Sequence, residues 1–442
     1  QAFWLKQKEI VQINCGHMET ASNASSASGI IYRDYTDADD AQCKALEERS
    51  MQGSRNPRME FAIKTLFRAS FEHNVTFDAK AKQYGSFAVK VAEVESTKSI
   101  VGVCCAVLKK VWLHGDLHVV GYIFELRIDE AYQSKGIGKT LTQQIEEVCI
   151  ARGATYLYLS VNDDNTKARN LYGKRGYNQC SVRKPVQFIL MEKVVESTEV
   201  AVDMVSMEEG LRLTQESYGK TDMLLENIRP IFESPLYEGT LIARSGDSIA
   251  GLSLWNGSYF VGFRVTRFFL PVWCWRLRSV RAVFSISLLY LGWRWVSCMH
   301  YHFLEAWGHG GIYNSTLFSL KALMTLGVSV AVAKVWKVLS FVGRKITSPG
   351  TKLRGRAFGV FASGPKEDQE RLLQAVLLRA QNIQLEKGYT FMLLNLDEKY
   401  EHRHSLSPAP FTTLFMLKYV GVGTGAKSTV FAPDNFFDPR DI

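Results

Sequence analysis

A glycine-rich stretch in the first half of the sequence has the residue types of a phosphate-binding loop. It reads Gln133-Ser-Lys-Gly136-Ile-Gly138-Lys139 and lies between a strand expected to end near Asp129 and a helix expected to begin near Ile137. Backbone N–H groups at a helix N-terminus are unpaired and lie at the positive end of the helix dipole, so they bind phosphate. Glycines keep side chains out of the way, and lysines add charge. By itself, the pattern also fits an ordinary strand–helix turn.

A second motif begins at Asn165 and ends at Tyr177. Between them it places Ala168, Leu171, Tyr172 and Gly176, which complete a short helix expected over 166–176. The glycine is a typical helix C-terminus. Both motifs therefore lie where a strand passes into a helix, a common position for binding and catalytic residues in mixed α/β folds.

Together the two motifs resemble those of the GNAT superfamily of acetyltransferases. The first family pattern, Q/R-x-x-G-x-G/A, is matched by Gln133, Gly136 and Gly138. The second, N-x-x-A-x-x-L-Y-x-x-x-G-F/Y, is matched from Asn165 to Tyr177. Their order, spacing and strand–helix context agree with the family over residues 29–193, for which we expect a GNAT domain.

The resemblance implies acetyl-CoA as cosubstrate and assigns its binding residues. The exposed strand edge at Leu126, Arg127 and Ile128 would hydrogen-bond the pantetheine arm as an added strand. Asn165 would contact the cofactor near its thioester. The pyrophosphate would be held, beside Gln133, by the loop and helix start at Ser134, Lys135, Gly136, Ile137, Gly138 and Lys139.

The resemblance also implies a reaction in which a neutral amine attacks the acetyl thioester directly. A backbone N–H of 126–128 would stabilise the oxyanion, and Tyr172 would protonate the departing thiolate. The alternative for Tyr172 is a core tyrosine that packs its helix. Glu125, just before the cofactor stretch, is the candidate base, and a salt-bridged strand residue is the alternative. The histidine groups near His300 and His402 have no clear set of partner ligands, so we expect no metal.

The surrounding pattern predicts an α/β (α+β) fold with a mixed, mostly antiparallel central sheet flanked by helices. Strands are expected at 86–94, 99–111, 118–129 and 155–161, and a strand at 185–193 closes the domain. The helix at 137–153 has apolar residues at helical spacing and ends at Gly153. Residues 1–28 are expected to be a flexible leader. Eight cysteines without framework spacing favour a reducing compartment.

The second half repeats the order hairpin, strand, helix, strand, strand over 240–442, after a helical connector at 194–239. We expect a degenerate GNAT-like domain that has lost the cofactor. Its long helix is preceded by Pro365, which lacks a donor N–H, and carries Glu367 and Asp368, which would repel a pyrophosphate.

A basic, tryptophan-rich insert covers residues 264–356. It has 14 Lys and Arg residues and one acid, Glu305, so its net charge is +13 against +9 for the whole chain. Such a surface could bind nucleic acid, an anionic membrane or an acidic protein partner. A helical subdomain that carries its charges to solvent is the alternative. Its apolar runs are too short to span a bilayer, so a membrane span is not expected.

The strand around Trp255 and the final residues, Phe437-Asp438-Pro439-Arg440-Asp441-Ile442, are similar to those of plant Hookless-type N-acetyltransferases. That resemblance implies a plant protein of the nucleus or cytoplasm, with histone-type substrates. The function expected from the sequence is acetyl transfer to an amine, with a protein lysine or N-terminus among the candidates. The alternative is a non-catalytic, acetyl-CoA-binding or regulatory interaction protein.

Overall fold

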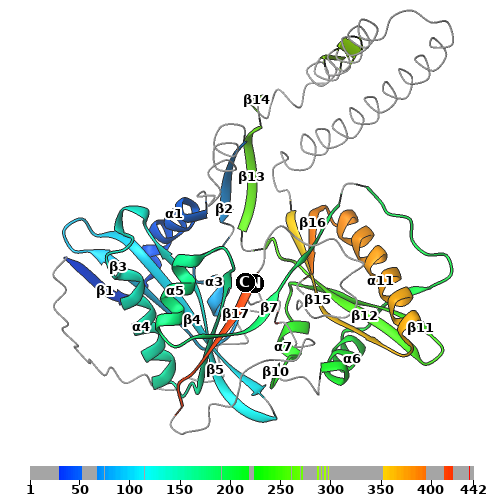
Figure 1. The fold of residues 1–442 in the computed structure, drawn as a ribbon, viewed down its shortest axis with the longest axis horizontal. Helices are drawn as coiled ribbons and strands as arrows, with labels where there is room; N and C mark the ends of the chain where they lie inside the picture. The colour runs from blue at the N-terminus through cyan, green and yellow to red at the C-terminus, as the bar shows by residue number, and fades with distance from the viewer. Residues whose placement is uncertain are drawn as a thin grey trace, which may run out of the picture.

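The computed structural model describes residues 29–51, 67–73, 75–113, 115–190, 192–218, 223–259, 261–268, 270–271, 352–394 and 413–421, with Asp438 and a few positions between 286 and 297. Two sheets, each with its own helices, lie side by side, and a short ribbon of three strands lies between them (Figure 1). The expected leader at 1–28 and most of the basic insert at 264–356 lie outside the described residues. In the described part, no helix is long and apolar enough to cross a bilayer.

The first sheet has eight strands, and all but one of its pairings are antiparallel, as the sequence predicts. The parallel pair joins its two central strands, β5 and β6. In spatial order the strands are β1 (Ile30–Asp34), β3 (Phe87–Val94), β4 (Ser99–Leu113), β5 (Asp116–Ile128), β6 (Tyr156–Asn162), β17 (Thr413–Tyr419) and β7 (Asn178–Arg183), with β10 (Met223–Leu225) beside β4.

Helices cover both faces of this sheet. On one face, α4 (Ile137–Ala151) packs with α5 (Thr166–Lys174); on the other lie α1 (Asp40–Met51) and α3 (Ala79–Lys82). Strand β4 shows the consequence, because Cys104 packs on the α4 side and Cys105 on the α1 side. A strand buried on both faces has a continuous apolar run instead of alternation, which is the pattern of residues 100–108.

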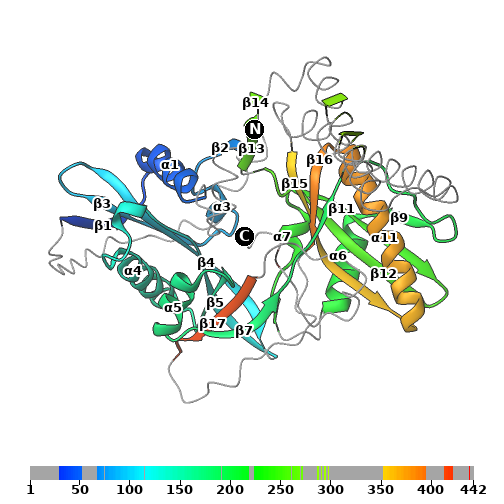
Figure 2. The same ribbon diagram turned by 45° about the horizontal axis from the view of Figure 1, so that its top comes forward.

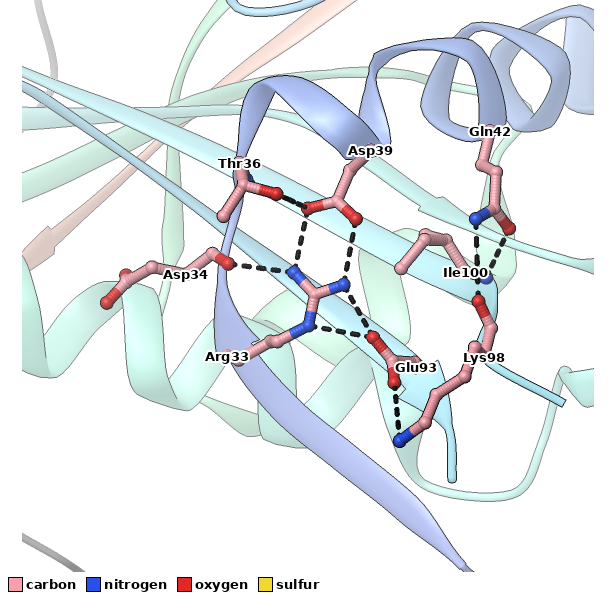
Figure 3. A network of polar contacts seen from close by, with 8 residues as sticks. All are labelled: Arg33, Asp34, Thr36, Asp39, Gln42, Glu93, Lys98 and Ile100. Atoms are coloured by element: carbon pink, nitrogen blue, oxygen red, sulfur yellow. Dashed lines mark hydrogen bonds and ion pairs between the residues drawn. The ribbon is translucent and has the colours of Figure 1, made fainter. Parts of the chain in front are cut away.

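A network of charges fixes the start of α1 to the sheet edge (Figure 3). Arg33 of β1 donates to both oxygens of Asp39, at 2.7 and 2.8 Å, and to Glu93 of β3. Asp39 also accepts from the amide of Thr36, and the hydrogen bonds to Arg33 and Thr36 lower the pKa of its carboxyl. Helix α1 is thereby held on the face of the sheet opposite to α4 and α5.

The second sheet has six strands, in the order β8 (Val186–Ile189), β16 (Tyr389–Leu394), β15 (Lys352–Ser363), β12 (Ser248–Trp255), β11 (Tyr237–Ser245) and β9 (Val202–Val205). Helix α11 (Lys366–Glu386) packs on one face, and α6 (Met207–Tyr218) and α7 (Arg229–Phe232) lie against the other (Figure 2). Segment 194–239, expected to be a helical connector, therefore contributes a strand and helices to this unit.

The two units repeat one order of elements. Leaving aside β2 (Phe67–His73), β10, β13 (Val261–Phe268) and β14 (Leu270–Pro271), the first runs β1, α1, α3, β3, β4, β5, α4, β6, and the second runs β9, α6, α7, β11, β12, β15, α11, β16. In each, a strand carries a bulge with a residue at positive φ, Glu125 at 52° in β5 and Gly359 at 58° in β15. In each, the following helix leads to a parallel strand. This shared geometry supports the expected second copy of the fold.

The two units exchange their last strands. Strand β8, which the sequence analysis expected to close the first domain, instead pairs antiparallel with β16 of the second sheet. Strand β17, from the second half, inserts between β6 and β7 of the first. Neither sequence, VQFI in β8 or TLFMLKY in β17, carries a local signal for its pairing partner, so local pattern does not decide which sheet they join. A shared apolar core, with Tyr122 and Tyr158 from the first unit and Trp255 and Phe358 from the second, joins the two.

Candidate active site

The start of α4 presents unpaired backbone donors. Gly136 has a φ of 85° and Ser134 a φ of 63°, both in the left-handed region. Among the described residues, the amides of 134–139 have no acceptor; the next amide, of Thr140, donates to the Gly136 carbonyl. A Cβ at Gly136 would meet nothing within 4 Å, so the space in front of the helix is open. This is the geometry that binds phosphate.

The second glycine of the loop, Gly138, is not required by its backbone conformation or by its neighbours. A Cβ at Gly138 would lie 3.7 Å from Ile128 Cγ1 and 3.8 Å from Leu171 Cδ2, which are ordinary contacts. Its φ is not in the left-handed region, so the protein itself would accept alanine here. A requirement for glycine must come from a group that approaches the backbone from outside.

The side chains around the loop are polar and basic. The Gln133 amide donates to the Ile128 carbonyl at 3.5 Å and accepts from Lys167 Nζ at 3.4 Å. The Lys135 ammonium lies 4.5 Å from the centre of the Tyr132 ring. Lys135 and Lys139 are exposed. The surface therefore adds positive charge at the helix start.

Strands β5 and β6 part beside this loop. Their parallel pairing runs from Val120–Tyr156 to Tyr122–Tyr158 and stops there. Beyond it, Glu125 and Leu126 form a bulge opposite Cys104 of β4. After the bulge, the β5 edge at 126–128 that faces away from β4 has no strand partner among the described residues. A linear amide chain could pair with that edge.

Glu125 lies at the centre of a buried ion cluster. Lys80 Nζ is 2.7 Å from its Oε1, and Arg127 donates to its Oε2 from Nε at 2.9 Å and from the terminal nitrogen at 2.8 Å. Burial alone would raise the pKa of Glu125, but Lys80 and Arg127 outweigh it and hold the pKa well below its usual range. The predicted salt-bridge alternative is therefore present, and Glu125 is ionised.

Glu47 of α1 completes this cluster. Its Oε1 lies 3.8 Å from Lys80 Nζ, and only 4% of its side chain is exposed. Burial and then the charge of Glu125 raise the pKa of Glu47. The sequence analysis missed Lys80 and Glu47, because they come from two helices with no motif and meet Glu125 only in the folded chain.

Tyr172 lies on the other side of the opening, in the core between α4 and α5. It is 7% exposed, and its ring meets that of Tyr177 edge to face at 5.7 Å. Within the described part of the chain, its hydroxyl makes no hydrogen bond. Burial, followed by nearby Cys104, raises the pKa of Tyr172, so the phenol stays protonated at neutral pH.

Asn165 has a structural task in this chain. Its side chain accepts from the Ala168 amide at 3.2 Å and caps the N-terminus of α5. The cap orients the helix that carries Tyr172. A cofactor contact by Asn165 remains a prediction.

No cluster of three or more His, Cys, Asp or Glu side chains within the described residues could hold a metal ion. The histidines near 300 and 402 lie outside those residues.

The first unit of the chain is similar to known acetyltransferases. Residues 51–177 fit the model of the acetyltransferase (GNAT) family. The [ribosomal protein bS18]-alanine N-acetyltransferase of Haemophilus ducreyi is 39% identical over 14% of this chain and 43% of its own length. The probable N-acetyltransferase HLS1 of Arabidopsis thaliana is 28% identical over 31% of this chain and 36% of its own. The matched regions thus span less than half of either relative.

A solved structure extends the likeness to both units. Saccharomyces cerevisiae N-myristoyltransferase with bound myristoyl-CoA is 8% identical, with a TM-score of 0.51, over 89% of this chain and 83% of that one. At that identity the likeness concerns the fold alone. The fold is that of the GNAT proteins, as the sequence predicts.

Proposed function

We propose that the first unit is an acetyl-CoA-dependent N-acetyltransferase that moves the acetyl group to an amine. The observation that carries the proposal is the pair of features around one opening: unpaired amides at the start of α4 and a buried, protonated Tyr172 where β5 and β6 part. The family match over 51–177 includes both features.

The residues present fit acetyl-CoA. The amides of 134–139, with Lys135 and Lys139, would hold the pyrophosphate. The edge of 126–128 would hydrogen-bond the pantetheine amides, and Gln133 would orient the loop. The acetyl group would then end at the opening, near the last paired residues, Tyr122 and Tyr158.

Tyr172 would donate a proton to the departing thiolate. Its raised pKa keeps the proton on the phenol until the thiolate forms, and its position between α4 and α5 keeps bulk water away. A backbone N–H of 126–128, aimed by the bulge, would stabilise the developing oxyanion. The bulge is fixed because Glu125, its first residue, is bound by Lys80 and Arg127.

Removal of the amine proton is the step for which Glu125 was predicted. Because its pKa is lowered, Glu125 is a weak base, and the proton would leave through water. We propose that its negative charge still draws the cationic amine to the opening and stabilises it there. The acceptor we propose is a protein amine, a lysine or an N-terminus, and location in the nucleus or cytoplasm of a plant stays a prediction.

The test is transfer from labelled acetyl-CoA to a panel of small amines, peptides with free N-termini and histone peptides. Labelled product from the wild-type chain, reduced in Tyr172→Phe, supports an enzyme. Binding of acetyl-CoA without transfer to any acceptor, unchanged in Tyr172→Phe, supports the non-catalytic alternative.

A further inference from the structure

A buried ion pair joins the end of the sequence to the centre of the first unit. Asp438 Oδ2 is 3.0 Å from Lys109 Nζ of β4, across 329 positions of sequence. Both side chains are 4% exposed. Charges this deeply buried are stable only as a pair, so Asp438 is bound firmly at this place.

The pair lies against an aromatic cluster. The Lys109 ammonium is 5.0 Å from the ring centre of Tyr84, 5.2 Å from that of Tyr122 and 5.3 Å from that of Tyr158. Distances of this size are those of cation–π contacts. The rings of Tyr122 and Tyr158 are stacked, with centres 4.8 Å apart. Lys109 and Asp438 thus fix the orientation of three tyrosine rings.

These rings lie at the point where β5 and β6 part. Tyr122 and Tyr158 are the last paired residues of the two strands. They belong to the face that packs against α3 and the second unit, whereas α4 and Tyr172 lie on the opposite face. We place the approach of the amine on this side of the sheet, because the cofactor would be held at the start of α4 on the other. The rings are buried, with Tyr122 3% and Tyr158 0% exposed, so they would support the opening from within the core.

We propose that Asp438 is a positioning residue of the acceptor side, which acts through Lys109 on Tyr122 and Tyr158. The inference rests on the proposed acetyltransferase function and deepens it. The second half of the chain supplies Asp438, and its β17 supports β6, the strand of Tyr158, by pairing with it along its whole length. The acceptor site is therefore a composite of both halves.

The experiment compares Asp438→Asn, Lys109→Met and the double variant in the full chain. Each single variant breaks this buried ion pair and should melt earlier, whereas the double variant removes both charges and should regain most of the lost melting temperature. At saturating acetyl-CoA, the KM for the amine should rise about 10-fold in Asp438→Asn and in the double variant. Acetyl-CoA affinity by calorimetry should stay within about twofold, because α4 is untouched.

Lys418→Met is the matched control. Lys418 also ties β17 to the first unit, 2.9 Å from Glu146 of α4, on the face of the sheet opposite to Tyr122 and Tyr158. It should change melting temperature but not the KM for the amine. A double variant that regains both wild-type stability and wild-type KM would overturn the positioning role.

A second measurement separates this inference from the proposed function. If the wild-type chain acetylates no amine, the proposed function fails. Amide hydrogen exchange then tests Asp438 independently: the double variant should exchange faster at 120–125 and 156–162, with α4 unchanged. Unaltered exchange at these strands would overturn the inference.

Discussion

The two units differ most at the start of their long helices. Before α4, Gly136 leaves open space and the amides of 134–139 have no acceptor among the described residues. Before α11, the same place is filled: Ser248 Oγ donates to Asp368 at 3.2 Å, and Arg371 lies 2.7 Å from the other Asp368 oxygen. Pro365 removes a donor N–H as well. The second unit thus keeps the fold but lacks the open helix start of the first unit. The difference depends on a few residues at the start of each helix.

The strand edges differ in the same way. The bulge in β5 leaves the edge at 126–128 without a strand partner in the described chain. At the corresponding bulge in β15, the Tyr218 hydroxyl of α6 donates to the Val360 carbonyl. The backbone beside the bulge thus has no strand partner at the open edge of the first unit, and in the second unit it is hydrogen-bonded by a side chain of the same unit. This difference confines the expected chemistry to the first unit.

The substitution Gly136→Glu should have the largest effect. It places a carboxylate at the helix start, where a pyrophosphate would bind, and should abolish acetyl-CoA binding as measured by calorimetry. The control is Gly153→Glu at the other end of α4, where φ is 88° and the space is also open. Both should lose roughly 1 kcal/mol of stability from the left-handed backbone. Equal cofactor affinity in the two variants would contradict the assignment.

Tyr172→Phe should lower kcat by about 10²-fold, the size expected for loss of a positioned proton donor. The neighbouring Tyr177→Phe keeps the ring contact and should change kcat by less than about twofold. Acetyl-CoA affinity should be similar in both. If both variants keep wild-type kcat, Tyr172 is a packing residue and the core-tyrosine alternative holds.

Glu125→Gln should lower kcat/KM by about 10-fold, because the bulge loses its ion pairs and relaxes. It should also change acid stability. The pKa of Glu125 is lowered by folding, so its stabilisation is present above its unfolded value of about 4.3 and is lost as pH falls below it. The variant should be less stable than wild type at pH 7 and differ less at pH 3, as urea unfolding would show. If the free energies of unfolding of Glu125→Gln and wild type differed by the same amount at pH 7 and pH 3, the ionised state of Glu125 would be contradicted.

Asp368→Asn in the second unit should have the smallest effect on the cofactor. It weakens the hydrogen bond from Ser248 and the ion pair with Arg371, at a cost of about 1 kcal/mol. Because Pro365 and Ser248 still fill the helix start, the stoichiometry of acetyl-CoA should stay at one per chain. A second bound equivalent in this variant or in wild type would contradict the loss of the site.

The sequence predicted those features of the fold that depend on residues close together in the chain. The sequence alone predicted the apolar period of α4, the glycine at its start and the acids at the start of α11. Each of these features depends only on residues a few positions away in the chain. The roles of Glu47 and Lys80 were not readable, since they are set by packing between α1, α3 and β5. The sequence also places a strand near 185–193 correctly but not its sheet, because pairing between distant strands leaves no local signal.

The exchange of β8 and β17 has a consequence for synthesis of the chain. The first sheet is not complete when its last local strand, β7, has left the ribosome, because its gap waits for residues 413–419. Until then β6 and β7 expose edges that can pair with other chains. A nascent chain halted before β17 should therefore be held by chaperones, and the first unit should mature only after residues 413–419 have been made.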